Sequence, residues 1–150
     1  MIKRILLTLL LAMPLILIGC EPDDEPSTSS TTSSSKSKSK TISKPTVNVT
    51  SHFASGTYDG WYVIGTVTTG DDDPSNVDCC LEWAKFAKKQ TGSVNLTNSS
   101  KMKVVNSSRS RVQFKKEFAG IKKGNYIYYR MVGSNSKYSS STSTTYMVAQ

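Results

Sequence analysis

The sequence is poor in the residues that enzymes use for acid–base and nucleophilic chemistry. Its 150 residues include one histidine, His52, and three cysteines, Cys20, Cys79 and Cys80. A nucleophilic mechanism needs a nucleophile, a base that activates it and donors for the developing charge. His52 has only Asp59 as a carboxylate close to it in the sequence, and neither Cys79 nor Cys80 has a recognisable catalytic setting. We therefore expect no catalytic residues and interpret the chain as a protein that is not an enzyme.

Metal and cofactor signatures are also missing from the sequence. No cysteine–histidine spacing typical of a metal site occurs, and no glycine loop that would cradle a phosphate. One acidic cluster, Asp71 to Asp73 with Asp78 behind it, contains the oxygen ligands that calcium prefers. Its spacing is not that of an EF-hand loop, and DDDPSN is a good turn sequence in its own right. We expect a turn there, and we expect no metal and no cofactor.

The two cysteines outside the N-terminal region are adjacent, which argues against a disulfide. Neighbouring Cα atoms lie about 3.8 Å apart, below the usual disulfide range, so a bond between Cys79 and Cys80 would be strained. On a strand the two side chains would point to opposite faces. We expect two free thiols, at least one of them buried as a small apolar side chain.

Acidic residues are scarce relative to basic ones. The chain has 19 lysines and arginines against 11 acids, and residues 46–150 carry thirteen against seven, a net charge of +6. A basic balance is compatible with nucleic acid or acidic glycans as partners, although charges scattered over a sheet are usually only solvated.

Only the N-terminus contains a long apolar run. Lys3 and Arg4 precede the apolar residues 5–18, and Gly19 is a small residue before Cys20. Charge, apolar region and small residue in this order are typical of a secretory signal peptide. This stretch of fourteen positions falls short of the ~20 residues that a membrane-spanning helix needs. We interpret residues 1–19 as a signal peptide, with a permanent transmembrane helix as the weaker alternative.

The end of this segment, Leu17-Ile18-Gly19-Cys20, resembles the lipobox of bacterial lipoproteins. The resemblance implies that a lipid is attached to the Cys20 sulfur, that the signal is cut just before it and that the new amine is acylated. The alternative is an ordinary signal peptide with an incidental cysteine. Two acyl chains already anchor a protein stably, so the resemblance implies a membrane as the partner of the N-terminus.

Four acids follow the cysteine: Glu21, Asp23, Asp24 and Glu25. Such a run resembles the surface-export signal of lipoproteins from one phylum of Gram-negative bacteria. The resemblance implies a protein on the outer face of the outer membrane. The alternative is a solvated spacer that happens to be acidic.

The next segment, residues 26–44, reads PSTSSTTSSSKSKSKTISK and contains almost no apolar residue. It cannot bury enough surface to offset its ordering entropy. We expect residues 20–44 to form a disordered tether between the lipid and a folded domain.

The remaining residues, 45–150, show short alternating segments separated by turn residues. Residues rich in Val, Thr, Tyr and Trp favour strands, and we expect six, at 45–50, 61–69, 77–87, 111–118, 125–133 and 141–148. Glycine, Asp, Asn and Ser mark the breaks, including NLTNSS (95–100) and VNSS (105–108). No segment of helical length has a clean 3.6-residue apolar stripe. This pattern predicts one all-β domain, an antiparallel β-sandwich.

Two blocks resemble a fibronectin type III-like module of the kind found in bacterial surface lipoproteins. The first is GTVTTGDDDPSNVDCCLEWAKFA (65–87), and the second is FKKEFAGIKKGNYIYYRMVGSN (114–135). The resemblance implies an immunoglobulin-like β-sandwich over residues 45–150. The sequence departs from that family at the tyrosine corner: Ile127 stands where the family has its tyrosine, and Tyr126 lies one residue early.

Which side chains face inward is only partly predictable. The resemblance places three residues of segment 125–133 in the core: Ile127, Tyr129 and Met131. In segment 77–87 both faces are apolar, with Leu81 and Trp83 on one and Cys80, Ala84 and Phe86 on the other. That register stays open.

The opposite face of segment 125–133 would carry Tyr126, Tyr128 and Arg130, and we take these as the candidate binding face. Exposed aromatic rings with arginine can stack on sugar rings. Arg109, Arg111 and Lys115 alternate in the same way. The simpler alternative is that such amphipathic side chains only cover the sheet.

These observations predict a lipid-anchored, non-catalytic protein of the outer membrane that faces the cell exterior. Its sandwich would bind an unidentified protein or glycan or have a structural envelope role, and we expect no nucleic acid as a partner. The alternative is a periplasm-facing accessory or immunity lipoprotein, because the sequence does not settle the orientation.

Overall fold

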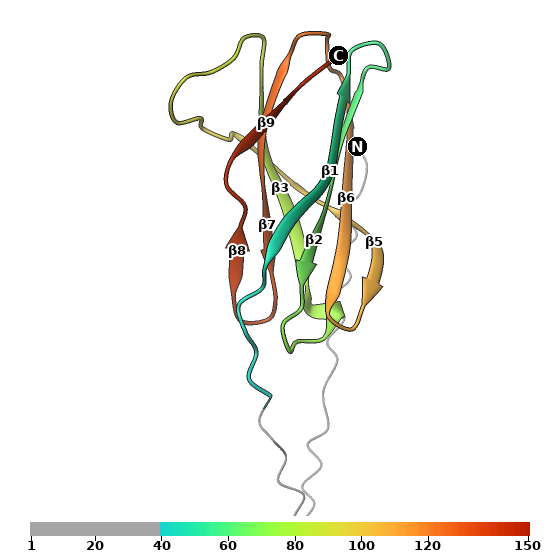
Figure 1. Cartoon of the computed structure of the whole chain (residues 1–150), viewed down its shortest axis with the longest axis vertical. Helices are drawn as coiled ribbons and strands as arrows, with labels where there is room; N and C mark the ends of the chain where they lie inside the picture. Colours follow the sequence, from blue (N-terminus) through green and yellow to red (C-terminus); the bar gives the residue numbers. More distant parts are fainter. Residues whose placement is uncertain (1–39) are drawn as a thin grey trace, which may run out of the picture. The chain divides into compact units, whose positions relative to one another are not determined.

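The computed structural model describes residues 40–150 (Figure 1). The predicted signal peptide, Cys20, the acids Glu21, Asp23, Asp24 and Glu25, and the predicted tether up to residue 39 lie outside the described residues. The Ser43 carbonyl accepts a hydrogen bond of 2.8 Å from the Asn135 amide. The packed domain therefore includes at least two residues before position 45, where the sequence predicted its start.

The described residues form two antiparallel sheets, which confirms the predicted β-sandwich. The first sheet has the order β1-β2-β6-β5, with β1 (Val47–Ser55), β2 (Gly60–Thr68), β6 (Arg111–Ala119) and β5 (Lys103–Ser108). The second has the order β4-β3-β7-β8, with β4 (Asn98–Lys101), β3 (Asp78–Phe86), β7 (Tyr126–Ser134) and β8 (Ser139–Ser141). Strand β9 (Thr145–Val148) also pairs with β7, and one 3₁₀ turn, η1 (Pro74–Asn76), precedes β3.

The strand order follows the immunoglobulin arrangement. In that arrangement the first, second, fifth and fourth strands form one sheet, and the third, sixth and seventh form the other. Here β4 is an added edge strand beside β3, and the chain then passes to β5 at the edge of the other sheet (Figure 1). The last strand of the arrangement is divided into β8 and β9, which pair with different parts of β7.

Two strands were missed by the sequence analysis. Segments 95–100 and 105–108 were expected to be breaks, but β4 and β5 include parts of both. The reason is that β3 and β6 offer free backbone groups along their edges, and pairing with them stabilises segments of low strand propensity. All six residues of β5 are exposed. The predicted segment 45–50 was also too short, because β1 continues to Ser55.

The inward faces of both sheets form the core, and they settle the open register of β3. Cys79 and Leu81 are buried, with Leu81 fully inaccessible, and Trp83 packs against the same core. On β7 three residues have 0 % exposure, as the family resemblance implied: Ile127, Tyr129 and Met131.

One core contact depends on a glycine. Gly65 of β2 lies so close to the facing sheet that an added Cβ would be 2.2 Å from the Met131 sulfur and 2.6 Å from the Asn48 carbonyl oxygen. Contacts below about 3 Å force neighbouring atoms to move, and a backbone carbonyl moves only with its strand. Gly65 therefore leaves the space that the end of the Met131 side chain occupies against β2.

The tyrosine corner that is typical of fibronectin type III-like modules is absent from the described residues. Ile127 occupies its position in the core, and the Tyr126 hydroxyl makes no hydrogen bond to another residue of the described part. The turn before β7 is instead closed by backbone bonds, from Gly124 N–H to the Ala149 carbonyl and from Asn125 N–H to the Lys122 carbonyl. Gly124 has a φ of +81°, which glycine adopts without strain.

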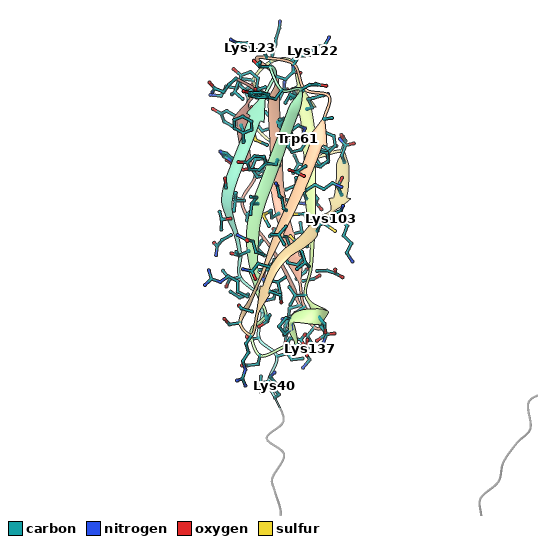
Figure 2. All side chains as sticks on the ribbon, turned by 90° about the vertical axis from the view of Figure 1, so that its right-hand side faces the viewer. Lys40, Trp61, Lys103, Lys122, Lys123 and Lys137 are labelled. Atoms are coloured by element: carbon teal, nitrogen blue, oxygen red, sulfur yellow. The ribbon has the colours of Figure 1, made fainter. Side chains whose placement is uncertain are left out.

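The described chain enters and leaves the sandwich at opposite ends. Figure 2 shows Lys40 and Lys137 at one end and Lys122 and Lys123 at the other. The C-terminal Gln150 bonds to Ala54 through its N–H and to Gly56 through its carbonyl. The loops that join β1 to β2 and β6 to β7 therefore lie at the end far from the chain entry.

Candidate binding face

The three residues of the predicted binding face share the outward side of β7. Directly opposite residues of antiparallel strands point to the same side of a sheet. Tyr126 pairs with Phe86, Tyr128 with Ala84 and Arg130 with Glu82, all on β3. The structure thus places Tyr126, Tyr128 and Arg130 on one face.

Tyr128 is nevertheless not exposed, which corrects the expectation for this residue. Its exposed fraction is 6 %, because the segment that follows β3 crosses over it. The Tyr128 hydroxyl accepts a bond of 2.9 Å from the Gln90 N–H and donates one of 3.2 Å to the Gln90 carbonyl. Tyr128 holds this loop in place and offers no ring surface of the kind that a partner needs.

Two residues that the sequence analysis did not assign to this face belong to it. Tyr146 of β9 pairs directly with Tyr128, and Phe86 lies opposite Tyr126. Together these four side chains form what we call the outer aromatic cluster: Phe86, Tyr126, Tyr128 and Tyr146. Ring centroids are 5.7 Å apart for Phe86 and Tyr128, 5.2 Å for Tyr128 and Tyr146, and 5.9 Å for Tyr126 and Tyr146.

The exposed part of the cluster centres on Tyr146. Its side chain is 39 % exposed, and Tyr126 and Phe86 are half-buried beside it. The sequence did indicate an outward direction for one of the two residues, since Tyr146 and Met147 are neighbours in the expected strand 141–148 and so point to opposite faces. The pairing of that strand with β7 was not visible in the sequence.

The cation at the cluster is Lys89 rather than Arg130. The Lys89 ammonium lies 5.3 Å from the centre of the Tyr146 ring, and a hydrogen bond to the Tyr146 hydroxyl raises the pKa of Lys89. The Arg130 guanidinium is paired with the Glu82 carboxylate at 2.5 Å. Arg130 is therefore already neutralised in part, and Lys89 carries the free charge at this site.

His52 lies within β1, an edge strand of the first sheet, and has a structural partner. It pairs with the inward-facing Val63 and directs its Nδ1 atom to the hydroxyl of Tyr129. Burial raises the pKa of Tyr129 to about 12, and its hydroxyl needs a partner there. Asp59, the carboxylate nearest in sequence, accepts a bond of 2.8 Å from the Ile121 N–H instead.

The acidic cluster forms the predicted turn, and the carboxylates of Asp72 and Asp73 accept hydrogen bonds in it. Asp73 caps η1 by accepting a bond of 2.8 Å from the Ser75 N–H. Asp72 is buried and accepts bonds from the Ser136 N–H at 2.8 Å and from the Asn76 amide at 3.0 Å. Within residues 40–150 no group of three His, Cys, Asp or Glu side chains is arranged to hold a metal.

We expect Asp72 to make the domain less stable in acid. Hydrogen bonds from Ser136 and Asn76 hold the pKa of Asp72 well below its ordinary value of 3.8. A group whose pKa is lower in the folded state contributes stability above its unfolded pKa, and this is lost as the pH falls below about 5 toward the folded value. Asp72→Asn should lower the free energy of unfolding at pH 7 and flatten its decrease toward pH 3, measured by urea denaturation.

Asp71→Asn is the matched control for this measurement, because Asp71 is exposed and adjacent. It should leave the free energy of unfolding at pH 7 within about 0.5 kcal/mol of the parent. Equal slopes between pH 3 and pH 7 in the parent and Asp72→Asn would contradict the assignment.

Both thiols outside the N-terminal region are free, as the sequence predicted. Cys79 is buried with its sulfur 3.5 Å from the Met102 sulfur, and burial raises the pKa of Cys79 to about 12. A thiol with such a pKa is protonated and unreactive at neutral pH. Cys80 is half-buried on the opposite face of β3.

Comparisons with known proteins give one distant structural similarity. No protein-family model matches the chain, and no curated protein matches it. A solved structure of the cycloalternan-forming enzyme from Listeria monocytogenes, in complex with a pentasaccharide substrate, is similar with a TM-score of 0.46 and 16 % identity. The match covers 65 % of this chain and 8 % of that enzyme, and it assigns no function. Within the described part, no helix is long and apolar enough to cross a membrane.

Proposed function

We propose that this chain is a lipid-anchored, non-catalytic protein of the cell surface whose fibronectin type III-like sandwich binds an extended glycan. The outer aromatic cluster carries the proposal. The exposed Tyr146 ring and the half-buried Tyr126 ring lie side by side over β7 and β9, with the Lys89 ammonium beside Tyr146.

The chemistry of the cluster suits a sugar chain. Aromatic rings offer large flat apolar surfaces, and tyrosine adds a hydroxyl that can hydrogen-bond at the rim. The rings are held in position by Tyr128, whose bonds to Gln90 fix the neighbouring loop. A rigid platform loses little conformational entropy when a ligand binds.

The N-terminal sequence supports display on a membrane surface. The lipobox-like ending at Cys20 supports a lipid anchor, and the acids that follow support export to the outer face. The described chain enters at one end of the sandwich, and the aromatic cluster lies toward the other end, where β7 begins (Figure 1). A tethered domain would in this way carry the cluster on the half away from its attachment.

We expect the double substitution Tyr126→Ser with Tyr146→Ser to weaken glycan binding about thirtyfold, if each ring contributes about 1 kcal/mol. The melting temperature should change by only a few degrees, because both rings are at least partly exposed. Binding is measured on an array of bacterial and host glycans and then by titration with the best ligand.

Tyr58→Ser is the control, since Tyr58 is 81 % exposed and lies in the loop between β1 and β2, outside the cluster. It should bind like the parent. If the double variant binds every glycan as the parent does, the aromatic cluster is not the binding face.

A further inference from the structure

The register of the first sheet gathers hydrogen-bonding side chains on its outward face, away from the outer aromatic cluster. Thr66 of β2 pairs with Gln113 of β6, and Gln113 pairs in turn with Asn106 of β5. In the next row Arg111 of β6 pairs with Ser108 of β5. Directly opposite residues share a face, so these side chains form two adjacent polar rows.

A β-bulge ends the regular pairing of these rows just beyond Asn106. The pairing of β5 with β6 shifts between Val104 and Asn106, so Val105 has no partner in the ladder. On the other side of the bulge the turn between the strands fixes the register, with Ser108 opposite Arg111, Ser107 opposite Val112 and Asn106 opposite Gln113. Bulges are frequent where a strand redirects a side chain toward a functional site.

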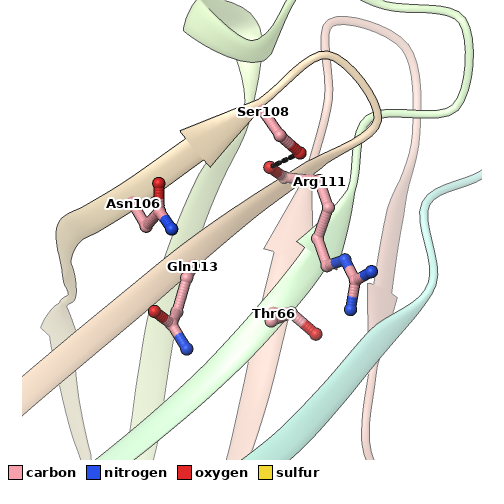
Figure 3. A pocket seen from close by; sticks show the side chains of 5 residues that line it. All are labelled: Thr66, Asn106, Ser108, Arg111 and Gln113. Atoms are coloured by element: carbon pink, nitrogen blue, oxygen red, sulfur yellow. Dashed lines mark hydrogen bonds between the residues drawn. The ribbon is translucent and has the colours of Figure 1, made fainter.

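The two rows surround a hollow of about 250 Å³ (Figure 3). Its lining consists of Thr66, Asn106, Ser108, Arg111 and Gln113. The Ser108 hydroxyl donates a bond of 3.0 Å to the Arg111 carbonyl. The Thr66 hydroxyl, the two amides and the guanidinium make no hydrogen bond to any other residue within 40–150.

This contrasts with the ordered polar side chains elsewhere in the domain. Asn135, Asn98 and Gln90 each bond to backbone groups and hold loops or edges in place. Because the Thr66 hydroxyl, the two amides and the guanidinium at the hollow make no such hydrogen bonds within residues 40–150, their donors and acceptors are available to a ligand. The guanidinium alone offers five N–H donors in a fixed planar geometry.

The charge of the sheet favours an anion in the hollow. The four strands of this sheet contain a single acidic residue, Glu117, and its carboxylate pairs with Lys115 at 2.7 Å. Arg111 therefore has no carboxylate partner on its sheet. Lys103, labelled in Figure 2, adds a further cation in the row beyond Asn106. Arginine recognises carboxylates through two parallel hydrogen bonds.

We propose that this hollow binds one acidic saccharide unit, with the sugar carboxylate on Arg111 and its hydroxyls on Asn106, Gln113 and Thr66. The volume lies below the ~300–1,000 Å³ of pockets for drug-sized ligands, so one ring fits and the rest of a polymer runs along the open sheet. An isolated unit of this size binds with a dissociation constant of about 1 mM.

The test is saturation-transfer difference NMR on the full-length protein in detergent micelles, with glucuronate as the probe and glucose as its neutral counterpart. We expect signal transfer to glucuronate and at least tenfold less to glucose. Arg111→Gln should weaken glucuronate binding at least tenfold. Gln113→Ala should weaken it severalfold without any change of charge.

Arg109→Gln is the matched control, because Arg109 carries the same charge two residues away but does not line the hollow. It should bind glucuronate like the parent. Equal losses in the Arg109 and Arg111 variants would mean unspecific attraction to a basic surface and would overturn the proposal, as would equal transfer to glucose. Circular dichroism verifies that each variant is folded. The cluster variant Tyr126→Ser with Tyr146→Ser should retain glucuronate binding, so this site and the proposed glycan face can fail separately.

Discussion

Replacing Leu81 with Ala is expected to lower the free energy of unfolding by about 3 kcal/mol. Leu81 has no exposed surface and lies in the centre of β3, opposite Met131 of β7 and Ser100 of β4. The substitution removes buried methyl groups and leaves a cavity that the two flanking strands prevent from closing. Domains of this size have a total stability of about 5–15 kcal/mol, so the loss is a large fraction of it.

The measurement is urea denaturation of a fragment covering residues 40–150, followed by circular dichroism. Cys80→Ala is the matched control, since Cys80 is the next residue but points to the outer face. We expect a loss of about 0.5–1 kcal/mol for this variant, because a half-buried sulfur is removed. A larger loss for Cys80→Ala than for Leu81→Ala would mean that β3 presents its other face to the core.

Replacing Cys20 with Ala is expected to move the protein from the membrane to the aqueous phase. The lipobox-like residues 17–20 support attachment of acyl chains at Cys20. Each buried methylene adds about 0.8 kcal/mol of membrane affinity, and two chains suffice for stable anchoring. Detergent phase separation measures the change: the parent should be in the detergent phase and the variant almost wholly in the aqueous phase. Equal partitioning of both proteins would refute lipid attachment.

Orientation is tested with a second variant that keeps the lipid. Changing Asp23, Asp24 and Glu25 together to Ala should leave the protein in the detergent phase but protect a C-terminal tag from protease added to intact cells. In the parent the tag should be degraded. Protection of the parent itself would favour a periplasm-facing accessory or immunity role over surface display.

Local patterns in the sequence determined the class of the fold and the positions of two strands, β2 and β7. Alternation over residues 61–69 and 125–133 predicted β2 and β7 because side chains of a strand alternate between its two faces whatever lies beside it. The family resemblance then placed the buried face of β7 correctly, at Ile127, Tyr129 and Met131. The turn at Asp71 to Asp73 was also predictable, since Asp, Pro and Asn shape a turn through bonds to nearby backbone.

Other features depended on neighbours that are distant in the sequence. Both faces of β3 are apolar, and only its packing against β7 and the facing sheet selects Leu81 for the core. Tyr128 is covered because the loop containing Gln90 crosses it. The polar segments of β4 and β5 are strands because β3 and β6 supply hydrogen-bonding partners.

In each of the two candidate binding sites, one part could be predicted from the sequence and another part depended on the tertiary structure. Alternation placed Tyr126 on an outward face, but the pairing of β9 with β7 brought Tyr146 beside it. Arg111 was visible as an exposed cation, but the pairing of β5 with β6 placed Asn106 next to Gln113. A residue's own sequence neighbours dictate the direction of its side chain, whereas the side chains around it depend on strand order, register and loop path. These are decided by backbone hydrogen bonds and burial across the whole domain.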